Sequence, residues 1–312
     1  MEPNELTLRP ISGPGELALF SRLPYVLNEE LADDLAAGRR RAEWMWVALR
    51  GDRLLARLAW WGPAGEDTPF LLDIFDIDDS DADLDRVDLG TRLLRAAMAE
   101  VIPSGTRPPE YIRNVPPEWR ETDRRVVEER MEALERVGAH MFVERLRFEW
   151  RAGTPIPEPR GRLKFRPVRD TEEVLTLMTQ VMAGTLDAHS RDDLTRMSAR
   201  EAALKHYESE LAHYRSPQEW WRVATLPDGE PVGFVTPARN AYNPVIGYLA
   251  VLPEHRGNGY IDEILGAGTR FLRAQDAPRI RAATDLGNTP MANAFHRAGY
   301  VNFERTINLT WH

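Results

Sequence analysis

Alternating apolar and polar positions mark short strand-like runs that recur twice along the chain. The run LTLRPIS begins at Leu6, a similar run, LKFRPVR, begins at Leu163, and each precedes a stretch with helical spacing. WMWVALRGDRLLARLAWW from Trp44 and WWRVATLPDGEPVGFVTP from Trp220 both have the pattern of a β-hairpin turned by a Gly-Asp or Asp-Gly pair. The pattern therefore predicts an internal repeat.

The closing segments of the two copies match best. LERVGAHMFVERLRFEW, ending at Trp150, aligns without a gap on FHRAGYVNFERTINLTW, ending at Trp311. The stretch between the copies, RAGTPIPEPRGR, contains three prolines and two glycines and cannot continue a helix or a central strand. We therefore expect an N-terminal domain over 1–152, a linker over 153–162 and a C-terminal domain over 163–312.

Each copy has the order strand, helices, hairpin, strand, helix, strand, helix, strands. This order predicts an α/β or α+β fold in which helices flank a mixed, mostly antiparallel twisted sheet. A doubly wound Rossmann sheet is disfavoured, because the glycine-bearing loop comes late in each copy and follows hairpin signals rather than the first strand of a βαβ unit.

Composition favours a small-molecule partner. The chain has 312 residues, 43% of them hydrophobic, and a formal net charge of -9, which argues against gripping nucleic acid or an anionic membrane. There is no apolar run of transmembrane length and no secretory signal at the start, so we expect a cytoplasmic protein. Cysteine is absent, which excludes disulfides, thiolate metal sites and a cysteine nucleophile.

The loop VLPEHRGNGY leads from an apolar run into a helix that we expect to begin at about Tyr260. Glycine lets the backbone approach a phosphate closely, and the helix dipole favours negative charge at this end. Arg256 can add a charge-assisted hydrogen bond. The amides that can point at one anion are those of Gly257, Asn258, Gly259 and Tyr260.

Two motifs of the second copy resemble those of the GCN5-related N-acetyltransferase (GNAT) family. Arg256 and Gly259 match the family's pyrophosphate loop, while Ile261 departs from its last small position. Downstream, Asn288 follows a strand, and a Gly-Tyr pair ends the next helix, as in the family's second signature. The whole chain is similar in architecture to bacterial tandem enzymes such as mycothiol synthase.

The resemblance implies an enzyme that uses acetyl-CoA as cosubstrate. The pyrophosphate would lie on the loop amides, the pantetheine along a splayed strand pair, and the amine would attack the acetyl carbonyl directly. The residues expected to contact the cofactor are Leu249, Ala250, Val251, Arg256, Gly257, Asn258, Gly259, Tyr260, Ile261, Asn288 and Phe295.

The catalytic acid is left open. The family often places a tyrosine seven residues after the asparagine, and this chain has Phe295 there. Tyr300, Tyr248, a water molecule or His296 could replace it. For both tyrosines the alternative interpretation is an aromatic side chain in the core.

Three positions are candidates for the general base. Asp285 ends a strand, where it could reach the acceptor amine or only cap the next helix. His189 follows Asp187 between the first helices, and its ordinary pKa suits proton removal near neutral pH, although a surface histidine is the alternative. Glu254 precedes the loop and is otherwise a solvated turn acid.

The first copy is expected to lack the donor site. Its segment LLDIFDIDDSDADLDRVDLG carries eight aspartates with only Arg86 against them, and a gapless placement sets Asp85 opposite Arg256 and Asp88 opposite Gly259. Repulsion from these carboxylates would offset the attraction of a helix start for pyrophosphate. A Ca²⁺ site is the alternative, but the EF-hand pattern is missing and we assign no metal.

The sequence thus predicts an acetyltransferase with an active C-terminal domain and a degenerate N-terminal domain, acting on a small-molecule primary amine as a monomer or homodimer. Acidic residues near the expected acceptor mouth favour a cationic amine. They are Asp187, Asp192 and Asp193, with His189 beside them. The rival hypothesis is a non-catalytic acyl-CoA sensor or interaction protein.

Overall fold

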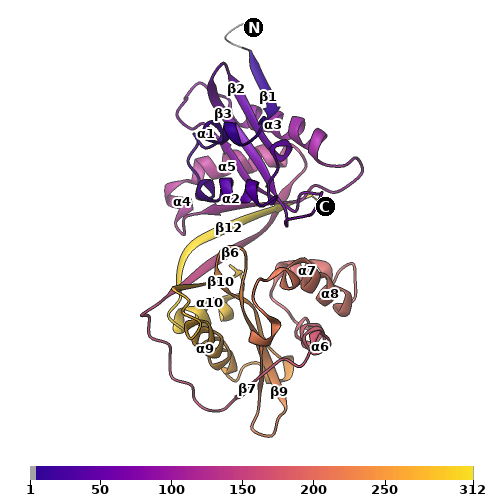
Figure 1. Ribbon diagram of the computed structural model, residues 1–312, viewed down its shortest axis with the longest axis vertical. Helices are drawn as coiled ribbons and strands as arrows, with labels where there is room; N and C mark the ends of the chain where they lie inside the picture. The colour runs from indigo at the N-terminus through magenta and orange to yellow at the C-terminus, as the bar shows by residue number, and fades with distance from the viewer. Residues whose placement is uncertain (1–4, 312) are drawn as a thin grey trace. The chain divides into compact units, whose positions relative to one another are not determined.

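The computed structural model describes residues 5–311, which form two compact units (Figure 1). Unit 1 contains the chain up to Glu144 together with the segment from Thr306, and unit 2 contains Arg145–Arg305. The division falls inside the last strand of each repeat, and not in the predicted linker over 153–162.

Unit 1 begins with a strand and short helices, continues with a three-strand meander, and then alternates helices and strands. Its strands are β1 (Leu6–Pro10), β2 (Met45–Arg50), β3 (Arg53–Trp61), β4 (Leu71–Ile77), β5 (Glu110–Val115) and the start of β6 (His140–Arg151). Its α-helices are α1 (Leu17–Phe20), α2 (Leu31–Ala36), α3 (Arg86–Val101), α4 (Trp119–Thr122) and α5 (Arg124–Glu135).

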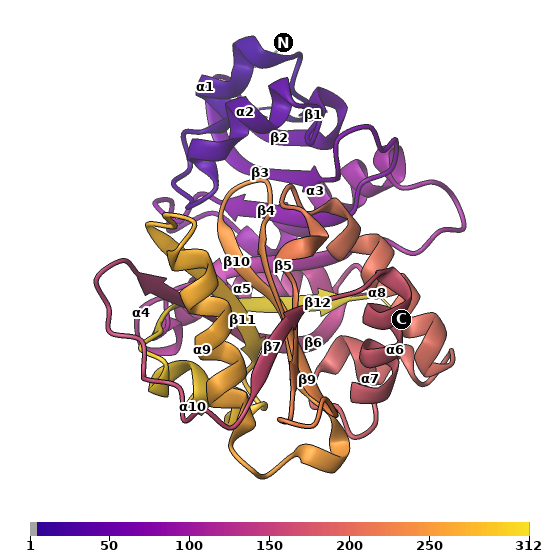
Figure 2. The same cartoon turned by 60° about the horizontal axis from the view of Figure 1, so that its bottom comes forward.

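Unit 2 follows the same order of elements. Its strands are β7 (Lys164–Pro167), β8 (Arg222–Thr225), β9 (Pro231–Arg239), β10 (Pro244–Val251), β11 (Arg279–Asp285) and most of β12 (Val301–Thr310). Its α-helices are α6 (Thr171–Val181), α7 (Ala188–Asp193), α8 (Ala199–Ser209), α9 (Tyr260–Arg273) and α10 (Thr289–Arg297). Helices α9 and α10 cover one face of its sheet and α6 to α8 the other (Figures 1 and 2).

The two repeats exchange the ends of their last strands. In unit 1 the strand order is β1-β2-β3-β4-β5, and the end of β12 follows; in unit 2, β6 pairs with β11, and β10-β9-β8-β7 follow. Trp150 of the first repeat is buried in the core of unit 2, and Trp311 of the second repeat is buried in the core of unit 1. Each unit is therefore completed by a strand from the other repeat.

The predicted fold class is confirmed: both units are mixed, mostly antiparallel sheets flanked by helices. The predicted hairpins are β2–β3 and β8–β9, with left-handed backbone at Gly51 (φ 58°) and Gly229 (φ 99°), which glycine adopts without strain. No helix in residues 5–311 is both long and apolar enough to span a bilayer.

Each sheet splays open between its parallel strands. In unit 2, β10 and β11 pair only at Val245 and Arg281; in unit 1, β4 and β5 pair only over the first two residues of each strand. A register shift between Ile246 and Leu249 adds one residue to β10, and Thr236 Oγ1 accepts a hydrogen bond from the amide of Tyr248 at this bulge. Bulge and splay leave the edge of β10 beyond Val245 without pairing to β11.

Candidate active site

The loop between β10 and α9 presents uncapped amides. Gly257 and Gly259 have φ of 80° and 69°, in the left-handed region that glycine adopts at no steric cost. Gly259 is the N-cap residue of α9, and no side chain caps this helix. Within residues 5–311, the amides at 257–261 donate to no protein acceptor. The start of α9 can therefore bind an anion with several backbone donors.

Arg256 ties this loop to the end of α6. Its Nη1 donates to the carbonyl of Ala183 at 2.7 Å, its Nη2 to that of Val181 at 2.7 Å, and its Nε to that of Val251 at 3.2 Å. Carbonyls at a helix C-terminus carry partial negative charge, so a guanidinium is favourable there. In this structure the guanidinium of Arg256 holds the loop against the end of α6 by hydrogen bonds to backbone carbonyls. The sequence analysis instead expects this side chain to bind the anion.

The backbone of Leu249, Ala250 and Val251 follows the bulge of β10. One edge of this segment pairs with β9, opposite Val235, Phe234 and Gly233. The other edge of this segment faces β11. It has no strand partner there, because β10 and β11 pair only at Val245 and Arg281. These residues thus lie where an extended ligand arm could pair with β10, as the sequence predicts.

Asp285 lies at the end of β11 in a cluster of charged side chains. It is 4% exposed, its Oδ1 lies 3.0 Å from Nε of Arg145, and its Oδ2 accepts a hydrogen bond from the amide of Ala188 at 2.6 Å. Asp187 Oδ2 lies 3.9 Å from Nη2 of the same arginine. His189 follows within the first turn of α7 and acts electrostatically on both carboxylates.

The two carboxylates of this cluster differ in proton affinity. Burial raises the pKa of Asp285, against the opposing effect of Arg145, and the charge of Asp187 adds to the rise. Burial also acts on Asp187, but Arg145 and the hydrogen bond from the Ser190 amide outweigh it and lower the pKa of Asp187. Asp285 is therefore the better proton acceptor of the pair.

Arg145 was not identified by the sequence analysis. It belongs to β6 of the first repeat, 140 positions before Asp285, and β6 enters unit 2 through the strand exchange. Its pairing position opposite Asp285 follows from the register of β6 and β11. No local pattern links these two residues.

Tyr248 lies at the bulge of β10 near this cluster. Its ring stacks on Phe234 with centroids 5.3 Å apart and meets His206 edge-on. Burial raises the pKa of Tyr248, and the charge of Asp187 raises it further. The hydroxyl is therefore protonated at neutral pH and can act as a proton donor.

Tyr300 and Phe295 lie in the core of unit 2. Phe295 is 0% exposed and stacks on Phe148 at 4.9 Å, and the hydroxyl of Tyr300 contacts Thr269 Oγ1 at 2.8 Å. Both side chains have the core positions that the alternative interpretation gives them, and a cofactor contact of Phe295 and an acid role of Tyr300 stay predictions. His296 is exposed and packs edge-on against Phe148.

Asn288 caps a helix. It is the N-cap residue of α10, and its Oδ1 accepts a hydrogen bond from the amide of Met291 at 3.3 Å. Within residues 5–311 the side-chain amide nitrogen of Asn288 donates to no protein acceptor, and a contact to a pantetheine arm stays a prediction. Glu254 is exposed on a 3-10 turn before the loop.

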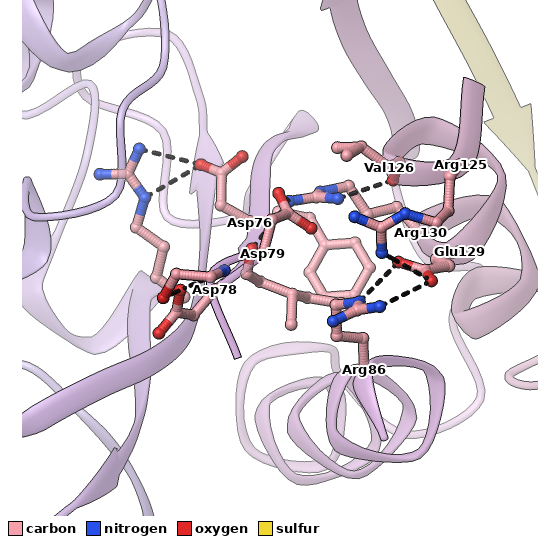
Figure 3. Close-up of polar contacts among 12 residues, drawn as sticks. Asp76, Asp78, Asp79, Arg86, Arg125, Val126, Glu129 and Arg130 are labelled. Carbon is pink, nitrogen blue, oxygen red and sulfur yellow. Dashed lines mark hydrogen bonds and ion pairs between the residues drawn. The ribbon is translucent and has the colours of Figure 1, made fainter. Parts of the chain in front are cut away.

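Unit 1 has a different helix start at the corresponding place. Asp85 is the N-cap residue of α3, and its carboxylate accepts the hydrogen bond of the Asp88 amide at 2.9 Å. Asp85 thus takes the position that Gly259 has in α9, three residues earlier than in the gapless placement. Beside it, Arg86 pairs with Glu129 of α5 (Figure 3). A carboxylate of the chain itself occupies the anion-binding end of this helix.

Side chains also fill the splay of unit 1. Arg113 of β5 donates from Nη1 to the carbonyl of Phe75 at 3.1 Å and to Oδ1 of Asp76 at 3.0 Å. The amide of Asn114 donates to the hydroxyl of Tyr25 at 2.9 Å. Backbone groups that face the splay are therefore bonded within the protein.

The acidic segment of unit 1 is neutralised by distant arginines. Asp76 is 2% exposed and pairs with Arg57 as well as Arg113, and burial of Asp76 is outweighed by these arginines, which lower its pKa. Further pairs are Asp73–Arg40, Asp78–Arg53, Asp79–Arg130 and Asp81–Arg53. The expectation of a run opposed only by Arg86 is therefore wrong. Residues 5–311 contain no group of three or more side chains arranged to hold a metal ion.

Comparison with known proteins identifies the class of unit 2. Residues 162–301 match the family model described as acetyltransferase (GNAT) domain. The matched segment contains the loop, the splayed strands and Asp285. Residues 162–301 are therefore similar to a GNAT acetyltransferase domain, which supports acyl transfer as the general activity of unit 2. A search of curated proteins gave no match.

Solved structures share the fold over the whole chain. A GCN5-related N-acetyltransferase from Sphaerobacter thermophilus has a TM-score of 0.63 at 16% identity, covering 99% of this chain and 96% of that one. A tandem GNAT protein from the clavulanic acid biosynthesis pathway has a TM-score of 0.55 at 15% identity, covering 98% of both chains. A glucosamine N-acetyltransferase region of a fungal β-N-acetylglucosaminidase has a TM-score of 0.60 at 11% identity, covering 99% of this chain and 38% of that one.

Proposed function

We propose that the protein transfers the acetyl group of acetyl-CoA to the primary amine of a small molecule, and that unit 2 alone carries the reaction. The observation that carries the proposal is the contrast between α9 and α3. The amides at the start of α9 are free of protein acceptors, whereas Asp85 caps α3. The glucosamine N-acetyltransferase region named above has a similar fold and a small-molecule amine in its name.

In the proposed complex the pyrophosphate of acetyl-CoA lies on the amides of residues 257–261, and its pantetheine arm runs along Leu249–Val251. The thioester then reaches the bulge of β10, beside Tyr248. Asp285 lies across the splay from this strand, at the end of β11.

The reaction needs one proton acceptor and one proton donor. The acceptor enters as an ammonium, and Asp285 takes its proton, because burial raises the pKa of this carboxyl. The amine nitrogen attacks the acetyl carbonyl, the new N–C bond forms, and the C–S bond breaks. Tyr248 gives its proton to the leaving thiolate, and the second proton that the nitrogen loses as it becomes an amide returns to the tyrosine oxygen. No covalent bond to the enzyme is required.

Charge supports an ammonium acceptor. Ionised Asp187 and Asp285 carry two negative charges against the single positive charge of Arg145, which favours one positive charge on the acceptor. Asp192 pairs with Arg196, and Asp193 pairs with Lys205 at 2.6 Å. These two aspartates contribute less to the acceptor mouth than the sequence analysis expects.

Release of free thiol from acetyl-CoA in the presence of primary amines tests the proposal. Asp285→Asn should lower kcat by about 100-fold with little change in the Kd of acetyl-CoA, because it removes the base and keeps the shape. Asp192→Asn, the same chemical change on α7, should leave kcat within about twofold. Full activity of Asp285→Asn would exclude this residue as the base. Tight donor binding without thiol release for any amine would favour the sensor hypothesis, which the burial of Tyr300 and Phe295 also motivates.

A further inference from the structure

Arg162 lies against the carbonyl side of the anion-binding loop. It lies two residues before the start of β7, and its side chain is one-third exposed. Its Nη1 donates to the carbonyl of Asn258 at 2.8 Å and its Nη2 to the carbonyl of Gly259 at 3.1 Å. Two carbonyls that flank the helix start are thus held by one planar guanidinium.

This contact orients the amides on the other side of the loop. The described peptide bonds are trans, so the N–H of each peptide points opposite to its C=O. The carbonyl of Asn258 shares a peptide plane with the amide of Gly259, and the carbonyl of Gly259 shares one with the amide of Tyr260. Both amides therefore point away from Arg162, toward the side where an anion can approach.

The charge of Arg162 is balanced within the protein. Glu263 is buried, and its Oε1 lies 2.6 Å from Nε of Arg162 while its Oε2 accepts from the Arg162 amide at 3.2 Å. The guanidinium also lies over the ring of Tyr260, 4.6 Å from its centroid. Because Glu263 offsets the positive charge, Arg162 acts through orientation of the loop more than through long-range attraction.

We propose that Arg162 is a positioning residue of the donor site, which holds the amides of Gly259 and Tyr260 toward the pyrophosphate of acetyl-CoA. This inference rests on the proposed function of unit 2. A flexible glycine-rich loop loses conformational freedom when it binds, and a loop held in advance loses less. Arg162 thereby increases affinity for donors that carry the pyrophosphate.

The test uses Arg162→Ala in the full-length protein, with Arg160→Ala as the control. Arg160 lies in the same linker and is exposed. We expect Arg162→Ala to weaken acetyl-CoA binding about tenfold by calorimetry, as two backbone contacts are lost, and Arg160→Ala to change it less than twofold. The KM for S-acetylpantetheine, which lacks the pyrophosphate, should not change in either variant.

The two donors separate positioning from loss of structure. An equal loss of affinity for both donors would mean that Arg162 only supports the fold. An unchanged Kd for acetyl-CoA would mean that the loop does not need Arg162. Either result would overturn this inference and leave the proposed function intact. Failure of the unmodified protein to bind acetyl-CoA would overturn the proposed function together with it.

Discussion

Helices α3 and α9 both follow a strand with a one-residue bulge at the edge of a splay, yet their first turns differ. In α9 the N-cap residue is a glycine with left-handed backbone, and no side chain caps the helix. In α3 the N-cap residue is Asp85, whose carboxylate accepts a hydrogen bond from the helix. A capping aspartate stabilises a helix by about 1 kcal/mol relative to a residue that cannot cap. Unit 1 gains this stability, whereas unit 2 keeps its amides available for a ligand.

The splays differ in the same way. Arg113 and Tyr25 bond to backbone groups of the strands in unit 1, while in unit 2 the Asp285 cluster lies at the strand end. The two units therefore differ by a carboxylate at a helix start and an arginine in the splay, while the sheet is the same. Four sets of substitutions test this comparison, from the largest expected effect to the smallest.

The largest effect is expected from Asp76→Ala in unit 1. Its removal leaves the buried guanidinium of Arg57 and that of Arg113 without their carboxylate, which should lower the free energy of unfolding by about 3–5 kcal/mol. Asp285→Ala is the matched change in unit 2. It should cost about 1–2 kcal/mol, because its partner Arg145 is partly exposed and can be solvated. Urea unfolding of the full chain measures both, and equal losses would contradict a sealed splay in unit 1.

The second effect concerns the anion site. Gly259→Asp places in α9 the capping carboxylate of α3 and should weaken acetyl-CoA binding at least about 100-fold, because the new carboxylate repels the pyrophosphate. Gly259→Ala is the control for backbone strain without charge and should weaken binding about tenfold or less. Calorimetric titration of the full chain distinguishes them.

The reverse substitution, Asp85→Gly, tests whether the capping carboxylate alone prevents unit 1 from binding acetyl-CoA. We expect no second binding site, because Arg113 and Tyr25 still fill the splay. Appearance of a second acetyl-CoA site in this variant would show that the splay is open.

Local features of the structure follow from sequence patterns. The hairpins, the loop before α9 and the strand ending at Asp285 are predictable, because alternation, turn residues and helix starts depend on neighbouring residues. The repeat is predictable for the same reason.

Contacts between distant segments were not predictable. The partners of Asp76 are 19 and 37 residues away, and Arg145 reaches Asp285 only through the exchange of β6. The core position of Phe295 depends on Phe148, which that strand also supplies. A fragment cut in the predicted linker would lose residues 145–151 of unit 2, so the experiments above use the whole chain.

The smallest effect concerns a feature that both units share. Glu173 is 8% exposed and receives hydrogen bonds from Arg166 and Arg169, and Glu16 is bonded in the same way by Arg9 and the Ser12 amide, at the same spacing. The hydrogen bond from Arg166 is the main cause that lowers the pKa of Glu173 from 4.5 to about 2.

Because the folded pKa of Glu173 is lowered, its ionised form stabilises the folded state above pH 4.5, and this contribution is lost as the pH falls toward about 2. Glu173→Gln should therefore lower the free energy of unfolding by about 1 kcal/mol at neutral pH, and the difference from the unmodified protein should shrink through this window. Glu16→Gln should have a smaller effect, since Glu16 is more exposed than Glu173. Urea unfolding at a series of pH values measures both, and a difference for Glu173→Gln that stays constant down to about pH 3 would mean that the ion pair does not stabilise the strand-to-helix entry.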